Sequence, residues 1–159
     1  MQNNNFKSYL LSKCLIGYGL VNGIINAIIF YFMERGHLDK VFEAKDIISD
    51  FAFTTFLLGS LLALIVIPMI AKDMEKGKFK ADNRVHKIEQ FLPDHILLIS
   101  LVVGLIACFI SVALSAVIVY LFNASPLNVT QMMIFKGVIC SIAGAISGYL
   151  CIIKVAYRK

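Results

Sequence analysis

Residues 129–153 read VTQMMIFKGVICSIAGAISGYLCII, and this stretch decides the fold. A helix that crosses a bilayer needs about 20 predominantly apolar residues, and this run supplies them. Its single charge is Lys136. Small residues recur in it at steps of three and four, namely Gly137, Ser141, Gly144 and Gly148. Because small residues at that spacing let a neighbouring backbone approach closely in lipid, we predict a membrane-spanning helix with a packed small-residue face.

Three further apolar runs precede this one. The four runs cover residues 14–33, 51–71, 96–122 and 129–153. Hydrophobic residues make up 59% of the 159-residue chain, against about 45–50% in soluble domains. Helices satisfy their backbone hydrogen bonds within one segment, as lipid requires. We therefore predict an all-α fold, an integral membrane four-helix bundle that forms a single transmembrane domain over residues 1–159.

The positive charges are placed unevenly along the chain. Two lysines precede the first run, three basic residues follow it, six lie in the connector 72–95, and three follow the last run. Lysine and arginine gather on the cytoplasmic side of a membrane. We therefore expect both termini and the connector 72–95 in the cytoplasm, and a location in the cell (inner) membrane. The hairpins 14–71 and 96–153 then run in the same sense, and the net charge of +5 reflects topology and not nucleic-acid binding.

Nothing in the sequence resembles a catalytic set. There is no serine, histidine and acid arrangement, and no paired carboxylate within an apolar run. The cysteines form no Cys-x-x-Cys pair, which argues against a redox enzyme and against a zinc site. We predict that the protein is not an enzyme and uses no cofactor or metal. The cysteines, interpreted as small packing residues, are Cys14, Cys108, Cys140 and Cys151.

Five polar residues within or beside the spans are candidates for a polar pathway or an intramembrane pair. Asn22 and Asn26 are four apart and share a helix face, either as a polar lining or as helix–helix contacts. Asp50 begins the second span, where it can cap the first turn, and Thr54 follows one turn later. Lys136 is either buried with Asp50 as its partner, or it extends to the outer interface.

Small residues predict how the helices pack. The short connector 123–128 joins the third and fourth spans, so we expect these two to form a close hairpin through their small-residue faces. The packing residues are Gly104, Cys108 and Ser111 on the third span, with Gly137, Ser141, Gly144 and Gly148 on the fourth. In the outer loop 34–49, intermittent apolar residues favour a short amphipathic helix that lies on the membrane.

Several motifs carry a family resemblance. They are Ile-Asn-Ala-Ile-Ile-Phe-Tyr at 25–31, Asp50 followed by Thr54-Thr55-Phe-Leu-Leu, Ile-Val-Ile-Pro ending at Pro68, and Phe-Lys-Gly around Lys136. This pattern covers nearly the whole chain and resembles a group of short four-helix bacterial membrane proteins described as permeases. On that resemblance the matching positions are Asn26, Asp50, Thr54, Pro68 and Lys136.

Two functions are compatible with these features. The first is a permease or channel-like protein for a small solute or ion that acts as a homo-oligomer, because four packed helices fill their own centre. The second is a non-transporting immunity, assembly or sensor subunit that binds another membrane protein through its small-residue faces. Transport requires Asn22, Asn26 and Lys136 to face a common wet space. Beyond the lipid bilayer, self-association is the partner that we expect.

Overall fold

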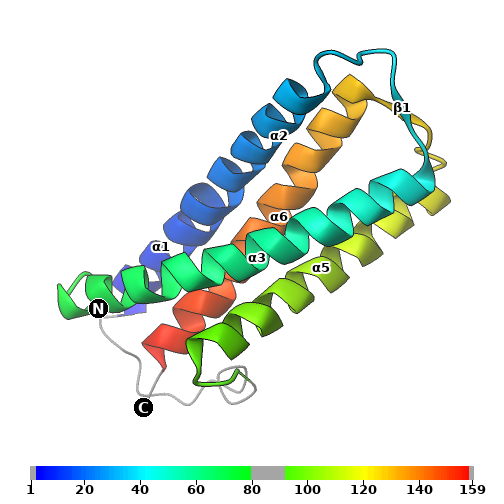
Figure 1. Ribbon diagram of the computed structural model, residues 1–159. Helices are drawn as coiled ribbons and strands as arrows, with labels where there is room; N and C mark the ends of the chain where they lie inside the picture. Colours follow the sequence, from blue (N-terminus) through cyan, green and yellow to red (C-terminus); the bar gives the residue numbers. More distant parts are fainter. Residues whose placement is uncertain (1–2, 80–91, 158–159) are drawn as a thin grey trace.

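The computed structural model describes residues 3–79 and 92–157, and four long helices dominate it (Figure 1). Each is long and apolar enough to cross a membrane, which confirms the prediction of an all-helical fold with four candidate spans. The first is continuous from Asn3 to Glu34, and we call it the N-terminal helix. Its three parts are α1 (Asn3–Leu11), η1 (Ser12–Leu20) and α2 (Val21–Glu34). The other three are α3 (Ala44–Glu75), α5 (Ile96–Leu121) and α6 (Val129–Ala156).

The last helix, α6, occupies the middle of the bundle. It contacts the N-terminal helix on one side and both α3 and α5 on the other, while α3 and α5 pack along each other (Figure 1). Met132, Ile139 and Cys140 of α6 are fully buried. The centre of the bundle is therefore filled by the side chains of α6.

The second span begins well before the predicted residue 51. α3 starts at Ala44, and the Asp46 carboxylate accepts a hydrogen bond from the Glu43 backbone N–H at 3.2 Å. This bond closes the first turn, so Asp46 caps the helix and Asp50 does not. The predicted amphipathic helix over 34–49 is wrong, because the second half of that loop forms the first turns of α3 itself.

A two-stranded ribbon joins the loops at one end of the bundle. β1 (Val41–Phe42) pairs antiparallel with β2 (Leu127–Asn128). Asn128 then caps α6, since its side chain accepts from the Gln131 N–H at 2.9 Å and the Gln131 side chain accepts from the Asn128 N–H at 3.0 Å. The ribbon thereby links the loops that lead into α3 and α6 (Figure 1).

Aromatic rings gather at the opposite end. The Phe6 ring lies 5.7 Å from the Phe79 ring and 6.3 Å from the Tyr157 ring, measured between centroids. The start of the N-terminal helix therefore meets the segment after α3 and the end of α6. Residues 80–91, half of the predicted connector 72–95, lie outside the described residues.

The small-residue faces pack differently from the prediction. α5 and α6 touch, but they do not pack through those faces as a close hairpin. A side chain at Gly104 of α5 would collide with Ser60 and the Phe56 carbonyl of α3, whereas Ser141 of α6 lies against Gly23 of the N-terminal helix. A small-residue stripe specifies close approach but not which helix approaches. Three other predicted packing residues of α6 face the N-terminal helix, namely Gly137, Gly144 and Gly148. On α5, Ser111 is buried and Cys108 is partly exposed.

The N-terminal helix widens over η1, which is π-helical. A turn of this kind carries an extra residue and shifts the side chains that follow onto another face. Both Tyr18 and its neighbour Gly19 are buried here, and Gly19 approaches the Ser141 carbonyl and the Ala145 side chain of α6. The π-helical segment therefore fits the N-terminal helix closely onto α6.

Candidate functional site

A charged pair links α3 and α6 inside the bundle. The Lys136 ammonium donates hydrogen bonds to both carboxylate oxygens of Asp50, each at 2.8 Å. The Lys136 side chain is only 10% exposed, whereas the Asp50 side chain is 33% exposed. Of the two alternatives for Lys136, the structure therefore has the buried and paired lysine.

The helix starts set the depth of this pair. At about 1.5 Å per residue along the helix axis, Lys136 lies about 10 Å from the first residue of α6, and Asp50 lies about 9 Å from the first residue of α3. The ribbon of β1 and β2 holds the two helix starts together. It thus brings to one level two charges that are 86 residues apart in the chain.

Aromatic rings cover the pair on the side of the ribbon. The Lys136 ammonium lies 5.0 Å from the centroid of the Phe30 ring, within the range of a cation–π contact. The Phe42 ring of β1 packs 5.5 Å from Phe30, and both are buried. Lys40 lies over the Phe42 ring at 4.8 Å. The loop before α3 thus supplies part of the cover over an ion pair that α3 helps to form.

The two asparagines bond to their own helix. Asn22 Nδ2 donates to the Tyr18 carbonyl at 2.7 Å, and Asn26 Nδ2 donates to the Asn22 carbonyl at 2.9 Å. No hydrogen bond reaches either Oδ1 atom from residues 3–79 or 92–157. The predicted alternative of cross-helix hydrogen bonds is therefore not seen, and each side chain keeps an unused acceptor.

Tyr18, Asn22, Asn26 and Phe30 are spaced by four residues and follow one face of the N-terminal helix. The contacts at both ends fix where this face lies. Tyr18 and the Asn22 side chain lie against Gly144, and Phe30 lies against Lys136. The four residues therefore run along α6 and lead to the ion pair. We call them the polar face, because three of the four carry polar groups.

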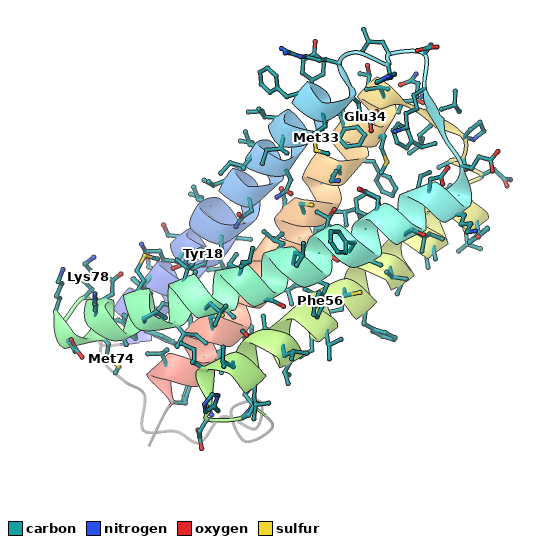
Figure 2. All side chains as sticks on the ribbon, in the orientation of Figure 1. Tyr18, Met33, Glu34, Phe56, Met74 and Lys78 are labelled. Atoms are coloured by element: carbon teal, nitrogen blue, oxygen red, sulfur yellow. The ribbon has the colours of Figure 1, made fainter. Side chains whose placement is uncertain are left out.

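The Tyr18 hydroxyl is the deepest polar group on this face. It is fully buried and makes no hydrogen bond within the described part of the chain. The Tyr18 ring packs against Gly148 of α6, and Figure 2 labels Tyr18 on the N-terminal helix. An unpaired buried hydroxyl costs about 1–3 kcal/mol, so this position is one where a bound polar group would be stabilising.

Thr54 lies one turn beyond Asp50 and is partly exposed. The buried threonine is its neighbour Thr55, which is inaccessible to solvent and donates from Oγ1 to the Phe51 carbonyl at 2.6 Å. Both threonines carry a hydroxyl, but only the helix register decides which one faces the core. Pro68, a matching position in the family resemblance, lies inside α3 and is exposed.

A second charged cluster, which was not predicted from the sequence, lies at the opposite end. Asp73 accepts hydrogen bonds from Lys78 at 2.6 Å and from the Tyr9 hydroxyl at 3.0 Å, and Lys13 lies 4.0 Å away. We had assigned Asp73 to the connector, but α3 continues to Glu75. The mixed charges of that segment resemble those of a solvated loop, but its first residues form the end of α3 and face the N-terminal helix.

The described residues also include a buried lysine near the end of α6, Lys154, which donates to the Asp94 carboxylate at 2.8 Å. They contain no cluster of residues that could hold a metal ion, and their cysteines form no disulfide. No family model, curated protein or solved structure matches the chain. The resemblance to bacterial permeases therefore stays a prediction.

Proposed function

We propose that this protein is a small permease or channel-like protein for a small solute or ion, with the Asp50–Lys136 pair as its central site. The four apolar helices indicate a multi-pass membrane protein. We place it in the inner membrane with both termini in the cytoplasm, because positive residues concentrate at the terminal segments and the connector.

One observation carries the proposal, namely an ion pair held at 2.8 Å within two membrane spans. Charged residues in membrane helices are costly and mark ion or substrate pathways more often than packing sites. If packing alone were needed here, apolar side chains of similar size would be as stable or more stable. The presence of both charges therefore supports a role in function.

The polar face supplies a direction for such a pathway. It runs from the ion pair past the unused Oδ1 atoms of Asn26 and Asn22 to the buried Tyr18 hydroxyl. Beyond Tyr18, the Asp73 cluster lies at the end of the bundle. Oxygen atoms that lack donors suit a cation or a solute rich in hydrogen-bond donors, so we expect a substrate of that class.

A single chain leaves little room for this route, because α6 fills the centre of the bundle. We therefore retain the homo-oligomer as part of the proposal, with the pathway completed at a boundary between chains. Such an interface would not use Gly104, Gly144 or Gly148, since these small residues already pack against helices of their own chain. The lipid-facing aliphatic surfaces of the N-terminal helix and α3 are the alternatives.

Flux measurements in liposomes test this function. Purified protein would be reconstituted and loaded with a pH indicator or with sodium, potassium or methylammonium, and flux would be recorded under an imposed potential. We expect wild-type flux of at least one of these cations and a loss of about ten-fold or more in Asp50→Asn. Lys45→Gln, which removes an exposed charge from the first turn of α3, is the matched control. Wild-type flux no greater than that of empty liposomes would contradict the proposal.

A further inference from the structure

An apolar pocket lies between the start of the N-terminal helix and the second half of α6. Its volume is about 290 Å³. Leu11, Cys14 and Leu15 line it from the N-terminal helix, and Ala145 and Tyr149 line it from α6. Leu11 and Leu15 are 49% and 59% exposed. The pocket is thus open to the lipid side of the bundle and offers an occupant almost no polar contact.

A positive charge lies at one end of this pocket. Lys7 precedes Leu10 and Leu11, two lining residues, by three and four positions, so it shares their face of α1 one turn nearer the helix start. Lys7 is exposed, and none of the ion pairs among the described residues includes it. Lys13 and Lys78, by contrast, share Asp73. Among residues 3–79 and 92–157, Lys7 therefore has no acidic partner, and it lies beside an apolar pocket.

We propose that the pocket binds one acyl chain of an anionic phospholipid, whose phosphate is bound by Lys7. An acyl chain gains little by leaving bulk lipid for an apolar pocket, so selectivity must come from the headgroup. One lysine near an anionic headgroup corresponds to a preference of about five-fold over a zwitterionic lipid.

The small volume of the pocket favours an acyl chain over a helix of a second copy. The N-terminal helix and α6 are in backbone contact at Gly19 and at Gly144, so the space beside that contact is small. A helix with side chains is about 10–12 Å across and needs a wider trough. A second copy packed symmetrically here would also bring two Lys7 residues towards each other, which is unfavourable.

Native mass spectrometry of the intact protein tests this site. The protein would be equilibrated with equimolar phosphatidylglycerol and phosphatidylcholine that have the same acyl chains. We expect about five-fold more bound phosphatidylglycerol in wild type, near parity in Lys7→Gln, and the wild-type ratio in Lys72→Gln. Lys72 is an exposed lysine at the same end but on α3. Parity in wild type, or an unchanged ratio in Lys7→Gln, would overturn the proposal.

Filling the pocket provides a second arm. Leu15→Trp should lower the amount of lipid retained, while Leu20→Trp, at a residue 52% exposed on the same helix, should not. Thermal unfolding with inorganic phosphate in place of lipid should show no stabilisation. If free phosphate stabilised the protein as much as phosphatidylglycerol, the acyl-chain part would be wrong. If Leu15→Trp changed the oligomeric size but not lipid retention, the occupant would be a second copy and the proposal would be wrong.

Discussion

Gly144 of α6 lies directly against the backbone carbonyl of Tyr18 in the N-terminal helix, and an added Cβ would overlap that carbonyl. The contact is between the backbones of the two helices, so no side-chain rotation can relieve the overlap. In lipid, helices associate through packing and not through hydrophobicity. This contact therefore determines whether the N-terminal helix packs closely against α6.

Gly144→Ala should therefore lower the free energy of unfolding by about 1–3 kcal/mol, the usual cost of overpacking. Thermal or denaturant unfolding in bicelles measures this loss. Gly17→Ala is the control, because a methyl group at Gly17 meets only the flexible Lys13 side chain at 3.9 Å. Equal stability of the two variants would show that the contact at Gly144 is looser than described.

The cover over the ion pair makes a second prediction. Phe42 is 6% exposed and packs on Phe30, so Phe42→Ala should cost about 3 kcal/mol in unfolding free energy. Phe32→Ala, which truncates a ring that is 58% exposed, should cost much less in the same unfolding measurement. A loss at Phe42 no larger than at Phe32 would mean that the ribbon does not cover the pair.

The Asp73 cluster makes a third prediction. Tyr9→Phe removes a hydrogen bond to a carboxylate that is only 7% exposed, so stability should fall by about 1–2 kcal/mol. Tyr31→Phe removes the hydroxyl of a tyrosine that is 45% exposed and should leave stability nearly unchanged. The two variants are compared by unfolding in the same bicelles, and indistinguishable midpoints would argue against the Tyr9–Asp73 bond.

Membrane orientation makes a fourth prediction. In a background without the native cysteines, Lys45→Cys should react with a membrane-impermeant maleimide in intact cells. Ser8→Cys, near the N-terminus, should react only after lysis. Both positions are exposed, so accessibility alone does not separate them. The reverse labelling pattern would place the termini outside and overturn the assignment from positive charges.

The sequence predicts the number and position of the long helices well, because four apolar runs in a chain of this length permit few alternatives. The helix ends were harder to predict. Asp46 and Glu43 read as loop residues by hydropathy, but they cap α3. Likewise Asp73 reads as part of a charged connector, although it lies on the last turns of α3. Polar residues at a helix end carry no hydropathy signal that distinguishes them from a loop.

Which helices pack against each other was also not predictable from the sequence. The spacing of Gly144 and Gly148 identifies a face of α6, but periodicity does not reveal that Tyr18 covers it. A π-helical segment also cannot be recognised from the pattern of residues 12–20, and it decides which side of the N-terminal helix meets α6. The candidate polar residues were chosen by charge and depth, whereas the distances between them depend on the ribbon that aligns α3 and α6.

A double-mutant cycle on Asp50 and Lys136 tests the central claim, that these residues act as one coupled unit within the membrane. Lys136→Met should lower the free energy of unfolding by about 2 kcal/mol, because it leaves the Asp50 carboxylate without its partner. Adding Asp50→Asn should recover part of that loss, giving a coupling energy of about 1 kcal/mol or more. Small and additive effects, with a coupling energy indistinguishable from zero in bicelles, would contradict the account.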